Sequence, residues 1–270
     1  MTGFHEAMPR LEYDSTVALN WSTARHLLRS PAHCRHYLMH RPSSTAAQSF
    51  GIAVHTAVLE PEKFEDEFTR APDVDRRTKA GKAAWAEHEA LSGFRTPLTC
   101  KEWAKCEAIR DRVLAHPRIS ELLLGDGVNE ASVVWEDATG VTCKGRLDRL
   151  CQFEGRPTVV DLKTCMDASY FSFERSIAKY KYHGQAAWYL RGLRSIADIG
   201  RRFLWLAVEK EPPYEVAIYE ADALTLDEGD RLCAHAMNLW KECQESGDWP
   251  GYDTGINVTT LPEWALEMSG

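Results

Sequence analysis

Three β-rich segments near the middle of the 270-residue chain constrain its fold more than any other feature. They cover residues 131–137, 141–153 and 157–165, and short turn sequences separate them. Helical patterns precede them, one long helix is expected over about 168–194, and two more strands are expected over 202–209 and 214–220. This order predicts an α/β fold with a mixed central β-sheet flanked by helices.

We expect a single domain built from three parts. Residues 15–125 form a helical N-terminal part, residues 126–220 form the α/β core, and residues 221–270 form a C-terminal helical part. The hydrophobic content of 44% and the nine tryptophans are sufficient for a substantial core, and most of the tryptophans are expected inside it.

The composition excludes several classes of protein. No segment approaches the roughly 20 continuous apolar residues of a membrane helix, and the first residues lack the basic start and apolar run of a signal peptide. We therefore expect a cytoplasmic protein with no membrane contact. The eight cysteines include no CxxC pair, so reduced, buried thiols are expected and structural zinc is not. A net charge of −8 still permits local basic patches that contact phosphates.

One predicted hairpin brings charged residues together. If Glu154-Gly155 is a two-residue turn, Asp148 lies directly opposite Asp161 on the neighbouring strand. Asp161 and Lys163 share a face because side chains alternate along a strand. Two carboxylates and one ammonium group are then expected on one side of the hairpin, and a one-residue slip in register would separate them.

Two neighbouring carboxylates repel each other unless a cation lies between them. Magnesium binds one or two carboxylates and keeps sites open for water and substrate phosphate. A lysine beside such a cation can act on the attacking water or offset charge in the transition state. Asp148, Asp161 and Lys163 therefore predict a magnesium site that acts on phosphate esters, although a buried Lys–Asp pair is the simpler alternative.

These residues also carry a resemblance to a known family. The segments Gly145-Arg146-Leu147-Asp148 and Val159-Val160-Asp161-Leu162-Lys163 resemble the D…DxK core of the PD-(D/E)XK nuclease superfamily. More specifically, the chain resembles the RecE-type branch, the C-terminal nuclease domain of exonuclease VIII, over roughly residues 15–220. Further motifs that fit this branch are the histidine helix 51–60, the basic segment 75–82, Glu130 before the sheet, and Tyr182, Gln185 and Tyr189 in a QxxxY motif.

The resemblance implies a role for each matching residue. His55, Asp148 and Asp161 would coordinate Mg²⁺, for which Mn²⁺ could substitute, together with the backbone carbonyl of Leu162. Lys163 would activate the attacking water. Catalytic roles also extend to Gln185 and Tyr189, which would touch the substrate phosphate from one helix face, and to Glu130, which would support the site. The residues expected to contact the DNA backbone are Arg76, Arg77, Lys79, Lys82, Lys179 and Lys181.

The same resemblance implies an activity. Members of this branch degrade linear double-stranded DNA from 5′ ends and leave 3′ single-stranded tails for recombination by a single-strand annealing protein of RecT type. They form ring-shaped homo-oligomers, and many belong to phages or prophages. We therefore expect a Mg²⁺-dependent 5′→3′ exodeoxyribonuclease that binds duplex ends. The alternatives are an endonuclease or single-strand-specific nuclease of the same superfamily, or a DNA-binding module without catalysis.

Overall fold

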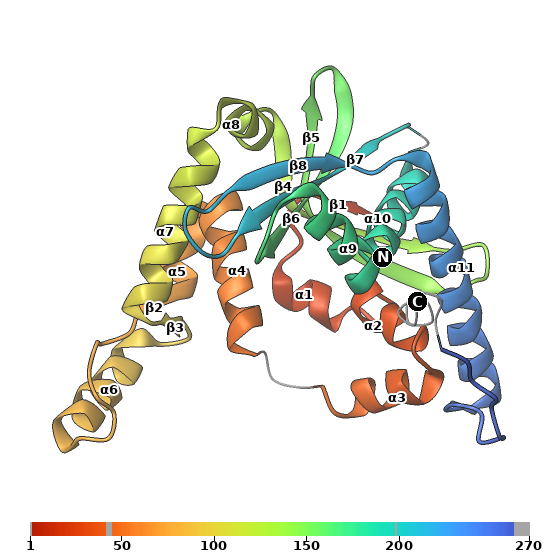
Figure 1. The fold of residues 1–270 in the computed structure, drawn as a ribbon, viewed down its shortest axis with the longest axis horizontal. Helices are drawn as coiled ribbons and strands as arrows, with labels where there is room; N and C mark the ends of the chain where they lie inside the picture. The colour runs from red at the N-terminus through yellow and green to blue at the C-terminus, as the bar shows by residue number, and fades with distance from the viewer. Residues whose placement is uncertain (1, 42–44, 198, 262–270) are drawn as a thin grey trace, which may run out of the picture.

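The computed structural model describes residues 2–41, 45–197 and 199–261, and its centre is a six-stranded mixed sheet (Figure 1). The order of the described strands in this sheet is β1-β4-β5-β6-β7-β8, in which β6 and β7 pair in parallel and the other neighbours pair antiparallel. The predicted α/β fold with a mixed sheet is confirmed. The strands are β1 (Gly3–His5), β4 (Gly127–Glu136), β5 (Thr142–Phe153), β6 (Arg156–Cys165), β7 (Arg202–Glu209) and β8 (Val216–Glu220).

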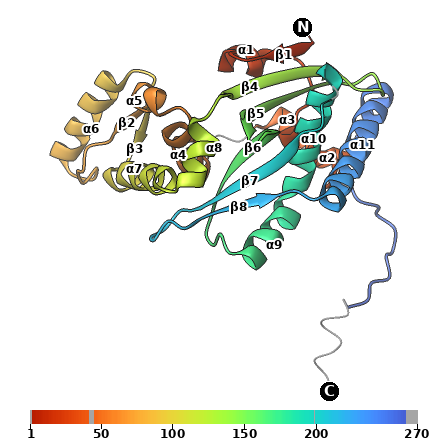
Figure 2. The same ribbon diagram turned by 90° about the horizontal axis from the view of Figure 1, so that it is seen from above.

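Helices cover both faces of this sheet and bury two hydrophobic clusters (Figure 2). One cluster lies between the sheet and the helices α2 (Trp21–Leu27), α3 (Pro31–Met39), α10 (Tyr182–Ile196) and α11 (Ala223–Ser246). The other lies on the opposite face, beneath α4 (Ala46–Leu59), α7 (Cys100–Ala115) and α8 (Pro117–Leu124).

A smaller unit extends from the second face. It contains the 3₁₀ helix η1 (Pro61–Lys63), α5 (Phe64–Glu67), α6 (Lys79–Ser92) and a parallel pair of short strands, β2 (Phe68–Arg70) and β3 (Thr96–Leu98). Figure 1 shows α6 at the end of this unit, far from the central sheet. The basic segment 75–82 leads into α6, so it lies on this projection.

The hairpin between β5 and β6 has the predicted turn and register. Glu154 and Gly155 have φ angles of 50° and 72°, as a two-residue type I′ turn requires. Phe153 pairs with Arg156 and Arg149 pairs with Val160. The regular ladder ends there, one position before Asp148 and Asp161, so the strands begin to separate where the two aspartates lie.

The neighbouring strand β4 is irregular at the same level. Asn129 pairs with Arg149 and Ala131 pairs with Leu147, but Glu130 between them has a φ of 55°. The side chains of β5 also change face near this point. Leu147 belongs to the cluster beneath α10, whereas Cys151 belongs to the cluster beneath α4 on the opposite face of the sheet. In a regular strand these two residues would share a face.

The expected single helix over 168–194 is wrong. The structure has two helices, α9 (Tyr170–Tyr180) and α10, joined by Lys181 in the left-handed conformation. Each helix packs against a different partner, since Phe173 of α9 stacks on Tyr219 of β8 whereas Gly184 of α10 lies against Trp21. Tertiary packing of the two helices thus outweighs the preference of residues 168–194 for one continuous helix.

The ends of the chain differ from the expectation in a further way. β1 and α1 (Arg10–Ser15) were not predicted, and they pack beside β4 near the core. Of the expected C-terminal helical part, α11 is present, and residues 262–270 lie outside the described residues. Within the described ranges, none of the helices combines the length and apolar character needed to cross a membrane.

Replacing Gly155 with alanine should destabilise the protein by about 1–2 kcal/mol, because a β-carbon is disfavoured at positive φ. The new β-carbon would meet no atom within 4 Å, so the loss would come from backbone conformation alone. Urea denaturation would measure it. Gly155→Asn is the control and should lose less, since asparagine tolerates this conformation. Equal stability of the alanine variant and the parent would contradict the turn assignment.

Candidate metal centre

Three adjacent strands place one acidic residue each at the level where the sheet becomes irregular. Glu130 on β4 and Asp161 on β6 flank Asp148 on β5, as the neighbouring pairs Asn129–Arg149 and Arg149–Val160 require. The helix α4 adds His55 from the side. Its N-terminus carries a capping box between Thr45 and Gln48, which stabilises the helix start.

A hydrogen bond ties the end of α4 to β4. The Asn129 side-chain amide donates to the carbonyl of Leu59 over 2.5 Å, and Val54 and Val58 pack in the core beneath the helix. Gly51 faces Thr164 of β6, with an ideal β-carbon 3.9 Å from its hydroxyl oxygen. These contacts fix α4 across β4 and β6 and so orient His55 towards the acidic row.

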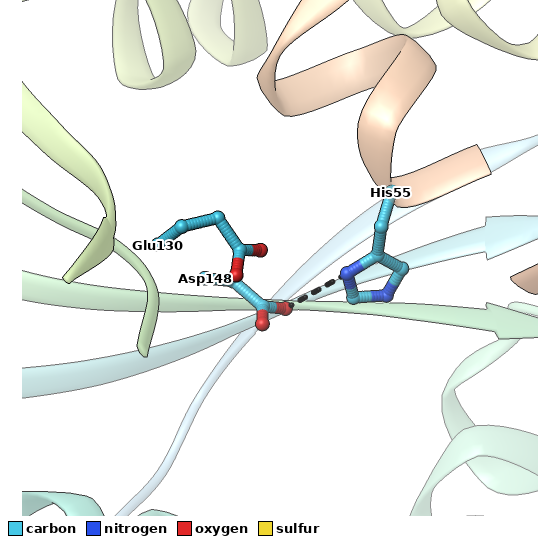
Figure 3. Close-up of side chains that lie close together, drawn as sticks. All are labelled: His55, Glu130 and Asp148. Carbon is cyan, nitrogen blue, oxygen red and sulfur yellow. Dashed lines mark ion pairs between the residues drawn. The ribbon is translucent and has the colours of Figure 1, made fainter. Parts of the chain in front are cut away.

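His55, Glu130 and Asp148 form the tightest group of potential metal ligands (Figure 3). One ligand atom from each residue lies within 4.8 Å of the other two, and 3.4 Å separates His55 Nδ1 from Asp148 Oδ2. Burial lowers the pKa of His55, and the nearby Lys163 ammonium lowers it further. A neutral imidazole is the form that binds a metal ion.

Asp148 is held in place by the backbone of β6. Its Oδ2 atom accepts a hydrogen bond of 2.8 Å from the Leu162 amide. Burial raises the pKa of Asp148 to about 7, even though the positive charge of Lys163 acts in the opposite direction. His55 also forms a hydrogen bond with the backbone of Leu162, so the imidazole, the carboxylate and this peptide unit converge.

Asp161 forms an ion pair with Lys163 deeper in the sheet. Its side chain is 1% exposed, and apart from the Lys163 ammonium group no described residue donates a hydrogen bond to either carboxylate oxygen. Burial raises the pKa of Asp161 to about 6. Burial lowers the pKa of Lys163, but the negative charges of Asp161 and Asp148 have a larger opposite effect, so the pKa is raised. The lysine is therefore protonated.

These residues fit a hard divalent cation. Two carboxylates and a neutral imidazole converge, and the buried Asp161 carboxylate lacks hydrogen-bond donors other than Lys163. The structure nevertheless changes the predicted grouping of His55, Asp148 and Asp161. Glu130 takes the third position in the closest group, and Asp161 turns to Lys163.

Arg146 is a site residue that the sequence analysis missed. Its Nε atom donates to Glu130 Oε2 over 2.6 Å, and another guanidinium nitrogen donates to the Met8 carbonyl over 3.0 Å. The N-terminal segment thus supports the arginine that holds Glu130. The predicted register could have identified Arg146, because it places this residue opposite Lys163 on the same hairpin.

The QxxxY residues lie close to the acidic row. Gln185 Nε2 donates to the Tyr189 hydroxyl over 3.0 Å. Tyr189 lies against Gly145, where a β-carbon would approach its ring to 2.9 Å. Burial raises the pKa of Tyr189 well above its usual value, and the charges of Asp161 and Asp148 add to this effect. Tyr182 lies under Lys163, with the ammonium nitrogen 4.8 Å from the ring centroid.

The predicted DNA-contacting residues fall into two separate groups. Lys179 and Lys181 lie at the end of α9, directly before Tyr182. The other group lies on the projection that ends in α6, away from the metal centre (Figure 1). There the Arg76 guanidinium lies 4.1 Å from the centroid of the Trp85 ring, and Arg77 pairs with Asp75 over 2.8 Å, while Lys79 and Lys82 are exposed in the first turn of α6.

A comparison with protein families assigns a family to most of the chain. The family described as "PDDEXK-like domain of unknown function (DUF3799)" matches residues 20–261. The chain belongs to this family. The fold is thus that of a PDDEXK-like domain. Met8, whose carbonyl accepts a hydrogen bond from Arg146, precedes the region that the DUF3799 family covers.

A solved structure also shares the fold. The crystal structure of a "putative exonuclease" from Eubacterium rectale aligns with a TM-score of 0.61 at 12% identity, covering 97% of this chain and 98% of the other. SSO0001 aligns with a TM-score of 0.37 at 14% identity, covering 85% and 81% of the two chains. The Vibrio cholerae protein VC1899 gives 0.25 at 10% identity, covering 85% and 57%. The last two scores are too low to indicate a shared fold. No curated protein matches the sequence.

The raised pKa values give a pH-dependent prediction. Asp148 and Asp161 have folded-state pKa values of about 7 and about 6, above the unfolded value of 3.8. Their contribution to stability is therefore present at low pH and lost as pH rises through these values. Mg²⁺ binds the ionised carboxylates, so it should raise the melting temperature more at about pH 8 than at about pH 5.

Differential scanning fluorimetry with and without Mg²⁺ would measure this difference. Asp148→Asn keeps an acceptor for the Leu162 amide but loses the ionised carboxylate, so the variant should show a much smaller Mg²⁺ effect at about pH 8. A Mg²⁺ effect that is independent of pH, or unchanged in this variant, would contradict the site.

Proposed function

We propose that this DUF3799 protein is a Mg²⁺-dependent nuclease that hydrolyses DNA phosphodiesters. The observation that carries the proposal is that the buried Asp161 and the largely buried Asp148 and Lys163 lie together beside His55. Burying several charged groups is costly, and replacing them with apolar residues usually does not reduce stability. Perturbed pKa values of neighbouring buried groups are typical of functional sites.

His55, Glu130 and Asp148 would hold the cation, and the Leu162 peptide unit lies beside them. A bound Mg²⁺, or Mn²⁺ in its place, supplies positive charge that polarises the phosphodiester and favours attack by water. Arg146 keeps Glu130 in position through its hydrogen bond, so this arginine acts on the site through a ligand rather than on the substrate.

Lys163 would act on the substrate as a fixed positive charge. The ammonium group is held between Asp161 and the ring of Tyr182, so its position requires little reorganisation. In this place it would donate a hydrogen bond to the attacked phosphate and offset the charge that develops in the transition state. Its raised pKa keeps it protonated and favours this role over that of a base.

Gln185 and Tyr189 would complete the phosphate contacts. Because the Tyr189 hydroxyl accepts a hydrogen bond from Gln185, its own proton remains available to donate to a phosphate oxygen. Farther away, the basic residues Arg76 to Lys82 would contact the DNA backbone along the projecting unit and make binding depend on salt.

The more specific proposal is a 5′→3′ exonuclease that acts on ends of linear duplex DNA and leaves 3′ tails for recombination. It rests on the RecE-type motifs of the sequence and on the likeness to the "putative exonuclease" from Eubacterium rectale. A ring-shaped homo-oligomer and a single-strand annealing partner belong to the same proposal. An endonuclease using the same residues is the second candidate.

Asp161→Ala and Lys163→Ala should each lower Mg²⁺-dependent cleavage of linear duplex DNA by at least about 100-fold, a loss of about 3 kcal/mol in transition-state stabilisation. Gel analysis of digestion products would measure it, and circular dichroism would show that each variant is folded. Asp111→Ala on α7, which removes an exposed carboxylate, should cleave normally. Unchanged cleavage by both site variants would contradict the catalytic roles of Asp161 and Lys163.

Digestion of covalently closed circles separates the two kinds of nuclease. An exonuclease should leave these circles intact while it degrades linear duplexes, since a closed circle has no ends. Linear duplexes labelled at either the 5′ or the 3′ terminus should lose the 5′ label first. Circles cut as fast as linear DNA would reject the exonuclease and retain the nuclease.

A further inference from the structure

Helix α9 carries an exposed stripe of aromatic and basic side chains. The stripe consists of Phe171, Arg175 and Lys179, which are four residues apart and therefore share one helix face. All three side chains are exposed, and Phe171 is 73% exposed. The buried face of the helix is different, since Phe173 there is fully buried and stacks on Tyr219. The helix thus buries one phenylalanine in the core and exposes the other, Phe171, to solvent.

The cations of this α9 stripe have no acidic partners. Among the described residues, no ion pair involves Arg175, Lys179 or the following Lys181, whereas Arg77 on the α6 projection pairs with Asp75. Glu174 is the only acidic residue of α9. Unpaired cations on a chain of net charge −8 form a local positive region that suits phosphate groups.

The C-terminal end of α9, where Lys179 lies, is connected to a residue beside Lys163. The C-terminal end of α9 leads through Lys181 into Tyr182, whose ring lies 4.8 Å from the Lys163 ammonium nitrogen. Tyr180 stacks on Tyr182 with 5.5 Å between ring centroids. From this end the 11-residue helix extends about 15 Å. Figure 2 shows α9 at the margin of the molecule beside β8.

We propose that the α9 stripe binds a single DNA strand at the metal centre, with Arg175 and Lys179 on successive phosphates and the Phe171 ring stacked on an unpaired base. This inference rests on the proposed nuclease function and adds the form of DNA that lies beside the site. A single strand is favoured because an exposed aromatic ring stacks on a free base face, which a duplex keeps inside its own stack.

Fluorescence anisotropy with a labelled thymidine oligonucleotide of about 20 nucleotides, in EDTA to prevent cleavage, would test the stacking contact. Phe171→Ala should weaken binding about 5- to 150-fold. Phe171→Tyr should bind normally because it keeps the ring, and Phe171→Leu should weaken binding although it remains apolar. The control Leu224→Ala removes another exposed apolar side chain, 76% exposed on α11, and should have no effect.

The phosphate contacts have a separate measurement. Arg175→Ala combined with Lys179→Ala should reduce the slope of log affinity against log salt concentration by about 1.4, or about 0.7 for each phosphate contact to a single strand. Arg231→Ala combined with Lys241→Ala removes two cations from α11 and should leave the slope unchanged. Affinity and salt slope that are unaffected by the α9 variants would overturn the proposal.

A parallel digestion with Mg²⁺ distinguishes this failure from that of the proposed function. If the parent chain degrades duplex DNA but the α9 variants bind the oligonucleotide normally, the strand-binding proposal is wrong and the nuclease assignment stands. If the parent cleaves no DNA yet its binding depends on Phe171, the nuclease assignment is wrong and the α9 stripe remains a strand-binding surface.

Discussion

The register of the β5–β6 hairpin decides which side chains meet in the candidate metal centre. The turn at Glu154 and Gly155 brings Asp148 level with Asp161 and allows Lys163 to reach the same side. Since strand side chains alternate, a slip by one residue would turn this set to opposite faces of the sheet. The two-residue turn at Glu154 and Gly155 prevents such a slip, because the turn type and loop length fix the register of a hairpin.

A second requirement is the irregularity between β4 and β5. Glu130 has a left-handed backbone conformation inside a strand, which costs about 1–2 kcal/mol for a residue with a β-carbon. Strained residues of this kind are concentrated at functional sites. Here the departure from regular pleating lets Glu130 and Asp148 approach His55 from two strands, and the Arg146 guanidinium holds Glu130 in that position.

The sequence was sufficient to predict the fold class, the hairpin turn and the encounter of Asp148, Asp161 and Lys163. These features follow from local rules, namely turn chemistry and period-two alternation. Three features did not follow. The break at Lys181 comes from the packing of α9 and α10 on different partners, and the replacement of Asp161 by Glu130 in the closest ligand group comes from the irregular pleat at Glu130. The support of Arg146 by Met8 depends on a contact between distant parts of the chain, which no local pattern reveals.

The proposed nuclease requires a divalent cation between His55, Glu130 and Asp148. Anomalous diffraction from crystals soaked in Mn²⁺ would locate such a cation, since manganese substitutes for magnesium and scatters anomalously. We expect one strong peak at about 2.0–2.3 Å from ligand atoms of these three residues. A map without a peak between them, or with its strongest peak elsewhere, would show that these residues are not the metal ligands.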